Sequence, residues 1–373
     1  MQAINFRTDS ISSLENQLDK HTTTNFNPTL AFVFASVSYD IDALSGLFDK
    51  HEIQLVGCTT AGEIINDEMS DETIVVLLLD MKKEHFFIHI ADEEDTFLAA
   101  KNATLKANEK FDNPSLIVFS SGLSINGDDI IRGVNEIGTY PLFGGMAGDD
   151  FKMKSSYSFT NNKKMDKALL FLIIDQNNIE INGLATSGWK PVGTKKIATK
   201  TKGNILYTID DKPALDVFLE YFDIPIPNDH RKDIIAEVGA KYPLHLQKDG
   251  YTTLRAPLMA TDEGALILAG EVIQGTSMFF SMPPDFEIIG QCVKDIGTLK
   301  ESFPETDAVI LVSCGARHLA LGPMIEGELE GLRELWNAPL TGFFSYGEIG
   351  AAKGTTICDL HNETVSLILL KEK

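Results

Sequence analysis

Three glycine-rich segments of the chain end in a glycine followed by an acidic residue. The first, Leu55 to Ile64, reads Leu-Val-Gly-Cys-Thr-Thr-Ala-Gly-Glu-Ile, and the last, Leu340 to Ile349, reads Leu-Thr-Gly-Phe-Phe-Ser-Tyr-Gly-Glu-Ile. The middle one, Leu142 to Asp149, is one residue shorter and ends in Asp. Glycine lets a backbone approach a ligand closely, while hydroxyl and carboxylate groups hydrogen-bond its polar atoms. The three segments therefore predict the binding of a small ligand.

Two cysteines and one arginine near these segments indicate further chemistry. Cys58 and Cys314 both lie where a strand is predicted to end, and His318 and His361 are near Cys314 in the sequence, so nucleophilic catalysis is one interpretation. A small buried thiol that only fills space is the other. In so acidic a chain, Arg317 suits bidentate binding of a carboxylate, or alternatively a structural salt bridge.

Established catalytic motifs are missing from the sequence. We find no Gly-x-Ser-x-Gly elbow, no P-loop and no GxGxxG pattern. His85 and His89 share one face of a predicted strand, but a metal site would need a third ligand, so an ordinary strand is favoured. We therefore predict no catalytic residues, no metal site and no cofactor.

Each glycine segment belongs to a repeated order of elements. An amphipathic helix precedes a buried apolar strand, a second helix and a short second strand follow, and an apolar strand closes the unit after the glycine segment. The first strands are predicted at 30–35, 116–120 and 308–312, and the closing strands at 73–79, 168–174 and 364–370. The expected fold class is α/β (mixed α+β), with repeated α-β-α-β-loop-β units that form mixed sheets flanked by helices.

A strand, a helix and a second strand in this order form a right-handed parallel unit, so both loops after the strands lie at one edge of the sheet. Ligands of open α/β sheets bind at this edge. The candidate ligand-binding residues there are Cys58, Thr59, Thr60, Glu63, Ser121, Gly145, Asp149, Cys314, Arg317, Ser345, Tyr346 and Glu348. Alternatively, the glycines only permit tight turns, and Glu63 and Glu348 cap neighbouring backbone.

Composition limits the classes of partner. The chain has 32 basic and 54 acidic residues, a net charge of 32 − 54 = −22, which repels nucleic-acid phosphates and anionic lipids. Its apolar runs have strand length, and its N-terminus has no apolar signal region, so we expect neither membrane insertion nor export. Four cysteines without a CxxC pair are typical of reduced thiols in the cytoplasm.

The chain between the second and third units is less regular. Strands are predicted at 179–185 and 204–209, a helix over 215–222, and a hairpin from strands 266–273 and 277–281. The polar, proline-containing stretch 223–233 is the strongest candidate for a boundary. At 373 residues, the chain is long enough for two domains.

Seven motifs, in order along the chain, resemble those of the FIST proteins, in both the N-terminal and the C-terminal FIST domain. They lie at 57–64, 143–149, 188–193, 204–215, 313–317, 342–350 and 361–364. Ala351 stands where proline is common in the family. The resemblance implies a FIST N-terminal domain over 1–215 and a FIST C-terminal domain over 216–373, with one clear unit at 285–371.

The resemblance also implies a function. FIST proteins are intracellular sensory modules of bacterial signal transduction that bind small ligands, with amino acids proposed. The implied partner is a chemoreceptor, a kinase or a cyclic-dinucleotide enzyme, and this chain is expected to stand alone in the cytoplasm. For an amino acid, Glu63, Asp149 or Glu348 would bind the ammonium, and Arg317 or loop N–H groups the carboxylate.

Two other functions remain open from the sequence. One is a small-molecule hydrolase or transferase that uses Cys58 or Cys314. The other is a protein-interaction scaffold whose cleft stays empty.

Overall fold

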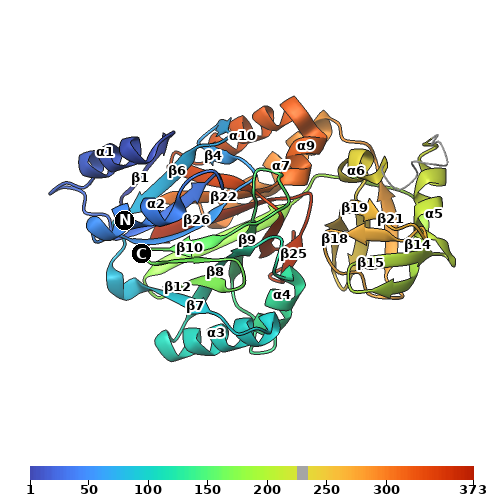
Figure 1. Cartoon of the computed structure of the whole chain (residues 1–373), viewed down its shortest axis with the longest axis horizontal. Helices are drawn as coiled ribbons and strands as arrows, with labels where there is room; N and C mark the ends of the chain where they lie inside the picture. The colour runs from blue at the N-terminus through green and yellow to red at the C-terminus, as the bar shows by residue number, and fades with distance from the viewer. Residues whose placement is uncertain (225–233) are drawn as a thin grey trace.

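A computed structural model describes residues 1–224 and 234–373 of the chain. It confirms a mixed α+β fold in which several mixed sheets are flanked by helices. Figure 1 shows a large body that carries both termini and a small body at the opposite end. Within the described ranges, no helix is both long enough and apolar enough to cross a bilayer.

The large body contains three six-stranded sheets with the same internal order. The first sheet runs β1 (Ala3–Thr8), β6 (Ile74–Leu79), β2 (Leu30–Ala35), β3 (Gln54–Thr59), β10 (Ser158–Thr160), β11 (Lys163–Met165). The second runs β7 (Phe86–Ala91), β12 (Leu169–Asp175), β8 (Pro114–Ser121), β9 (Leu142–Ala147), β24 (Gly347–Ala351), β25 (Cys358–His361). The third runs β13 (Ile179–Thr186), β26 (Val365–Glu372), β22 (Ala308–Cys314), β23 (Leu340–Ser345), β4 (Glu63–Ile65), β5 (Glu68–Ser70). In each sheet only the two middle strands are parallel.

These sheets define three sequence units: unit 1 is residues 3–79, unit 2 is 86–175, and unit 3 is 179–186 with 286–372. The last two strands of every sheet come from a different unit than the first four. Hairpin β4–β5 of unit 1 pairs in the sheet of unit 3. Hairpin β24–β25 of unit 3 pairs in the sheet of unit 2, and hairpin β10–β11 of unit 2 pairs in the sheet of unit 1. The exchange is a closed cycle, so the three units form one body.

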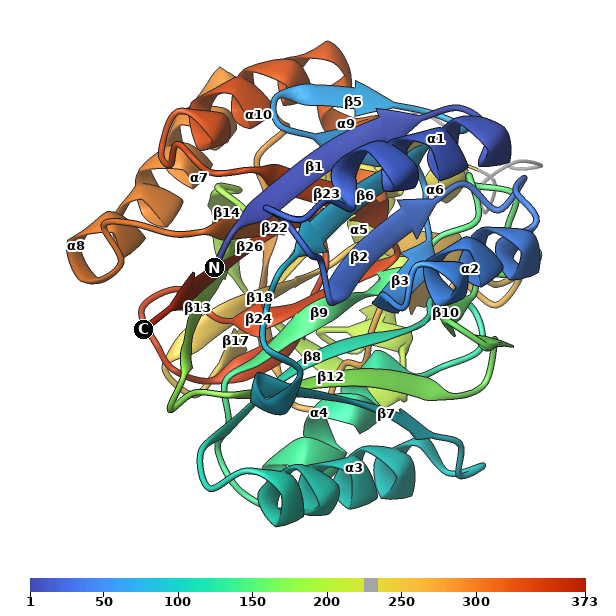
Figure 2. The ribbon, with the colours of Figure 1, turned by 90° about the vertical axis from the view of Figure 1, so that its left-hand side faces the viewer.

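Helices cover the outside of the sheets, as Figure 2 shows from the end that carries the termini. They are α1 (Ile11–His21), α2 (Ile41–Lys50), α3 (Thr96–Lys110), α4 (Gly127–Asn135), α7 (Phe286–Gly297), α8 (Leu299–Ser302), α9 (Gly315–Leu321), α10 (Ile325–Arg333) and the short 3-10 helices η1 (Lys83–His85) and η4 (Gly322–Met324). Between the sheets, one phenylalanine from each unit meets the others: Phe34, Phe119 and Phe343 have ring centroids 4.6–6.1 Å apart. The three sheets therefore share one hydrophobic core.

The small body is residues 191–281, inserted in unit 3 between β13 and α7. Its elements are β14 (Pro191–Lys202), β15 (Ile205–Ile209), β16 (Lys212–Pro213), α5 (Ala214–Tyr221), α6 (Ile234–Val238), η3 (Gly239–Lys241), β17 (Leu244–Lys248), β18 (Tyr251–Arg255), β19 (Pro257–Ala260), β20 (Leu266–Leu268) and β21 (Ser277–Ser281). It has a core of its own around Phe218 and Phe280.

The strands of the small body pair differently from the sequence-based expectation. The predicted hairpin of 266–273 with 277–281 is wrong, because β20 pairs with β15 and β19 whereas β21 pairs with β14 and β17. The apolar residues after Leu268 belong to a connection in which the Val272 N–H donates to the Gly203 carbonyl. The candidate boundary at 223–233 lies outside the described residues from position 225. Position 215 lies in α5, and the division there remains a prediction.

Candidate functional site

The three glycine segments meet at the carboxyl ends of their parallel strands. Each gives one backbone N–H to the next segment, so that three hydrogen bonds close a ring. The bonds, 2.8, 2.9 and 3.0 Å long, join Ala61 to Phe344, Tyr346 to Met146 and Gly148 to Thr59. A Cβ at Gly148 would lie 2.6 Å from the Ala61 nitrogen, which explains the glycine. The structure thus brings the three segments together, and backbone hydrogen bonds occupy the place where they meet.

The acid of the first segment binds its own unit. Glu63 is fully buried and accepts hydrogen bonds from the Thr60 hydroxyl and from the N–H and hydroxyl of Thr73, the latter two at 2.9 and 2.8 Å. Burial raises the pKa of Glu63 to about 7. Glu63 thus fixes the start of the closing strand to the glycine segment.

Glu348 likewise links the glycine segment of unit 3 to the start of its closing strand. It is fully buried and accepts hydrogen bonds from the hydroxyls of Ser345 at 2.5 Å and Thr364 at 2.8 Å. Burial raises the pKa of Glu348 to about 8. The capping role considered from the sequence therefore describes the contacts of both glutamates.

Asp149 is bound differently. Its carboxylate accepts from the N–H groups of Met153, Lys154 and Ser155 at 3.0, 2.6 and 3.0 Å, and from the Tyr346 hydroxyl at 2.6 Å. Burial acts to raise the pKa of Asp149, but these hydrogen bonds outweigh it and hold the pKa below its ordinary value. Asp149 thus shapes the loop that follows it.

Arg317 is enclosed. Its side chain is fully buried, and the guanidinium donates to both oxygens of Glu328 at 2.5 and 3.2 Å. The other donors reach the carbonyls of Ser187 and Glu363 at 2.6 and 3.2 Å and the Cys292 sulfur at 3.2 Å. These five contacts use all the guanidinium donors. The contacts are those of the structural salt bridge, the second interpretation from the sequence.

A cavity of about 590 Å³ lies beside the ring. Its walls are the loop 122–127 of unit 2, the strand ends and α9 of unit 3, and the small-body segments 256–258 and 268–271. Of the twelve candidate residues, Cys314, Ser345 and Tyr346 line it.

The part of the lining in which polar side chains are buried, called the buried end below, belongs to unit 3. Cys314, Ser345 and Asn362 line it and are 3%, 0% and 1% exposed. The Asn362 Oδ1 atom has no hydrogen-bond partner among the described residues. Burial raises the pKa of the Cys314 thiol well above its ordinary value, and the neighbouring carboxyls of Glu348 and Glu363 add to the effect. The thiol therefore stays protonated near neutral pH.

The remaining candidates lie behind the lining. Cys58 is fully buried in β3, and burial raises its thiol pKa well above the ordinary value. The Thr60 hydroxyl donates to the Glu63 carboxylate, and the Thr59 hydroxyl donates to the Gly148 carbonyl at 2.6 Å. A Cβ at Gly145 would lie 2.5 Å from the Val312 side chain, so this glycine permits close packing.

Ser121 supports the cavity indirectly. Its hydroxyl accepts from the N–H groups of Leu123 and Ser124, both at 3.2 Å, and hydrogen-bonds the Ser156 hydroxyl at 2.9 Å. Leu123 and Ser124 line the cavity, so Ser121 sets the shape of this wall.

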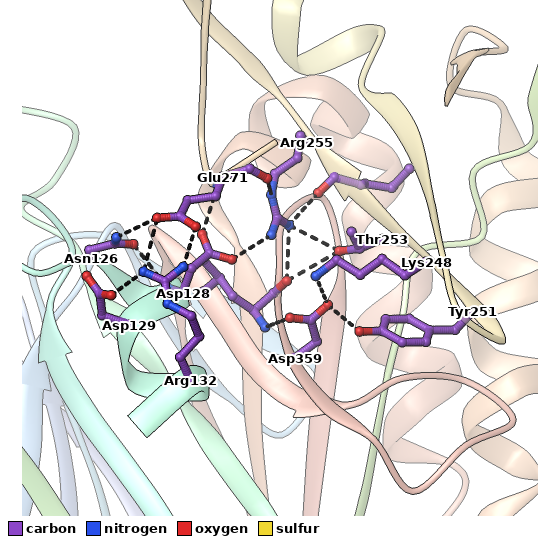
Figure 3. A network of polar contacts seen from close by, with 12 residues as sticks. Asn126, Asp128, Asp129, Arg132, Lys248, Tyr251, Thr253, Arg255, Glu271 and Asp359 are labelled. Atoms are coloured by element: carbon purple, nitrogen blue, oxygen red, sulfur yellow. Dashed lines mark hydrogen bonds and ion pairs between the residues drawn. The ribbon is translucent and has the colours of Figure 1, made fainter. Parts of the chain in front are cut away.

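A polar network fixes the small body against the large one (Figure 3). Two of its residues, Asn126 and Glu271, also line the cavity. Arg255, fully buried, donates to the Asp128 carboxylate and the Leu360 carbonyl, both at 3.0 Å. Glu271 is ion-paired with Arg132 of α4, and its own N–H donates to Asp128 at 2.8 Å. These contacts hold α4 and the end of β25 to β18 and the segment after β20.

The same network continues on unit 3. Asp359 of β25 accepts a hydrogen bond from the Tyr251 hydroxyl at 2.8 Å and is ion-paired with Lys248. Any movement of the small body would have to break or rearrange these contacts.

Sequence reasoning missed most of the lining. Asn362 and the small-body residues Ala256, Leu258 and Glu271 were not candidates, nor were Phe151 and Met153 after Asp149. A signal existed only for Asn362, since Asn362-Glu-Thr364 and Asp71-Glu-Thr73 introduce the closing strands alike. No sequence pattern indicates that the small body covers one strand edge.

Comparison with known proteins agrees with this architecture. A family model of the FIST N domain matches residues 29–212, and one of the FIST C domain matches residues 214–351. The uncharacterized protein MJ1623 of Methanocaldococcus jannaschii is 22% identical over 325 residues, which make up 78% of this chain and 61% of that protein. The chain thus spans less than two thirds of the length of that relative. FIST domains are associated with sensory signal transduction. Because both domains match in order across most of the sequence, the chain belongs to the FIST family.

Proposed function

We propose that this protein is a small-ligand sensor whose ligand binds in the cavity between units 2 and 3 and the small body. The observation that carries the proposal is the position of that cavity, at the carboxyl ends of parallel strands and at the junction of two bodies. Ligand sites concentrate at both kinds of place. FIST domains bind small ligands in signalling, which agrees with the proposal.

The signal would be a change at the junction. Loop 122–127 and Glu271 line the cavity and also border the network that holds the small body. A ligand that contacts both walls stabilises one arrangement of the two bodies. We propose that a separate cytoplasmic partner, a chemoreceptor, a kinase or a cyclic-dinucleotide enzyme, reads this arrangement.

The resemblance to FIST proteins favours an amino acid as the ligand. Its expected acid and base contacts are otherwise engaged: Glu63 and Glu348 bind their own units, Asp149 binds the loop after it, and Arg317 binds Glu328. An amino acid would have to use Asn362 and backbone N–H groups. A thermal-shift screen with the common amino acids tests this version, which fails if none of them stabilises the protein.

The site itself is tested by filling it. Ala316, half-buried in the first turn of α9, lines the cavity, so Ala316→Trp should occupy its volume. Native mass spectrometry of purified wild-type protein should find a bound small molecule that the variant lacks. Ala43→Trp, at an exposed alanine of α2, is the control. Equal retention of the molecule in Ala316→Trp and wild type would place the ligand elsewhere.

A Cys-dependent reaction has weaker support. The Cys314 thiol lies at the buried end of the cavity, but a protonated thiol is a poor nucleophile. Alkylation with iodoacetamide near neutral pH decides the matter, because rapid modification of Cys314 in the folded protein would favour this second function.

A further inference from the structure

The charge of the cavity lining limits the ligand. Of the lining residues in the described part of the chain, only Glu271 is charged, and no lysine, arginine or histidine is among them. The Glu271 carboxylate is already paired with Arg132 and accepts from Asn126 at 3.1 Å. A carboxylate or phosphate that entered would lose its hydration and gain no cation. The net charge of −22 opposes anions further.

At the buried end, the Asn362 carboxamide is a neutral polar group that can bind a ligand. Ser345 donates to Glu348, and Tyr346 donates to Asp149, so both hydroxyl protons are used inside the protein. Asn362 is 1% exposed, and its carboxamide oxygen has no hydrogen-bond partner in the part of the chain that the structure describes. A buried amide without a partner is costly, and a ligand with a neutral hydrogen-bonding group would remove that cost.

A cationic ligand would bind weakly at the buried end of the cavity. An ammonium needs an ionised acceptor, and the fully buried Glu363 beside Asn362 does not line the cavity. Burial raises the pKa of Glu363 well above its ordinary value, which disfavours the ionised form that an ammonium would need.

The open end of the cavity is apolar. Four of its lining side chains are exposed although they are large and apolar: Phe151 (38%), Met153 (61%), Leu258 (40%) and Leu319 (60%). They come from three places, the loop after Asp149, β19 of the small body and α9. Exposed apolar side chains that gather around a cavity mark a binding site, and methionine adapts to ligands of different shape.

From these observations we propose that the ligand is an uncharged amphipathic molecule, an amide, ester or alcohol with an aliphatic or aromatic tail. Its polar group hydrogen-bonds Asn362 at the buried end, and its tail leaves past Phe151, Met153, Leu258 and Leu319. This proposal rests on the proposed function, because it names the class of ligand for the same cavity.

The test is competition against N-phenyl-1-naphthylamine, an uncharged apolar dye whose fluorescence rises on binding. The full chain should bind the dye saturably. Decanamide should displace it at concentrations about tenfold lower than decanoate or decylamine, and leucine should not displace it. If decanoate, decylamine or leucine proves the strongest competitor, the ligand class is wrong.

Three variants locate the contacts. Asn362→Leu should keep dye binding but raise about tenfold the concentration of decanamide that displaces the dye. Leu319→Ser should weaken both dye and decanamide binding, whereas Leu98→Ser, at an exposed leucine of α3, should not. If Asn362→Leu, confirmed as folded by circular dichroism, needs no more decanamide than wild type to displace the dye, the assignment of the polar contact is overturned.

The failure of this proposal and of the proposed function are distinguishable. Charged competitors that bind wild type but not Ala316→Trp contradict the ligand class and leave the site in place. Dye binding that Ala316→Trp does not reduce, or no binding by wild type, contradicts both.

Discussion

Units 1 and 3 contain the same hydrogen-bonded contact between the glycine segment and the closing strand, but the residues around it differ in solvent exposure. In each, a threonine hydroxyl donates at 2.8 Å to the glutamate of the glycine segment, Thr73 to Glu63 and Thr364 to Glu348. In each, the residue before that threonine is a glutamate with positive φ, 53° at Glu72 and 56° at Glu363. Yet Glu72 is exposed, whereas Glu363 is fully buried.

The difference lies in what covers each strand edge. Asp71 of unit 1 is exposed, but the corresponding Asn362 lines the cavity that the small body completes. The repeated unit supplies a rigid edge with small and hydroxyl residues. In unit 3, the inserted small body adds a second wall, and the cavity lies between this wall and the strand edge. Matched variants in the two units test this interpretation.

The largest effect is expected at Arg317. Arg317→Met leaves the fully buried Glu328 without its cation, and breaking a buried ion pair typically costs about 3–5 kcal/mol. Chemical denaturation should show this loss in the free energy of unfolding. A double variant, Arg317→Met with Glu328→Met, should recover most of it, because it leaves no buried charge. A loss below about 1 kcal/mol in the single variant would contradict the enclosed ion pair.

The next effect is the pH dependence of the two buried glutamates. Below pH 4.5, the ordinary pKa of a glutamate, both the folded and the unfolded state hold the proton. Between pH 4.5 and about 8, only the folded state keeps it at Glu348, so this carboxyl lowers the free energy of unfolding as the pH rises. Glu348→Gln should therefore raise stability by about 2–4 kcal/mol at pH 8 relative to its effect at pH 4.

Glu63→Gln is the matched variant in unit 1. The pKa of Glu63 in the wild type is raised to about 7. The fall in the free energy of unfolding with rising pH should therefore end about one pH unit lower than for Glu348, and it should be smaller. Denaturation curves recorded across this pH range measure both variants. Equal pH profiles of the two variants would mean that the two units bury their glutamates equally well.

A smaller effect is expected when one hydroxyl is removed from each unit. Thr364→Val and Thr73→Val keep the shape of the side chain but take a hydrogen bond from a buried carboxyl, which costs about 1–2 kcal/mol. Thr364 is 3% exposed and Thr73 is half-buried, so the loss should be greater in unit 3. A greater loss at Thr73, measured by urea denaturation, would reverse the comparison.

The sequence predicts the units well because their strands are continuous apolar runs. Leu30–Ala35 and Ala308–Cys314 are buried on both faces, and such runs are recognised without knowledge of their partners. The exchange of hairpins could not be predicted. Strand β4 has three residues, too few for a periodic pattern, and its partner Gly342 is far along the chain from Ile64.

The candidate site was predicted in part for the same reason. Cys314, Ser345 and Tyr346 follow directly from the ends of two recognisable strands. Arg317 was a reasonable candidate, but the partners that enclose it come from Ser187, Glu328 and Glu363, which no local pattern places beside it. The walls from the small body depend on how an insertion folds back, and short strands such as β20 carry little signal.

The smallest effect is expected at Tyr39, which occupies in unit 1 the place of Arg317. Its hydroxyl donates to the Glu72 carbonyl at 2.8 Å, just as Arg317 donates to the Glu363 carbonyl. Because Tyr39 is only half-buried, water can replace its hydroxyl, and Tyr39→Phe should cost about 0.5–1 kcal/mol in a denaturant titration. The variant should also leave dye binding in the cavity unchanged. A loss as large as that of Arg317→Met would show that the open edge of unit 1 depends on its polar contacts as much as the covered edge of unit 3, and the contrast between the two units would then fail.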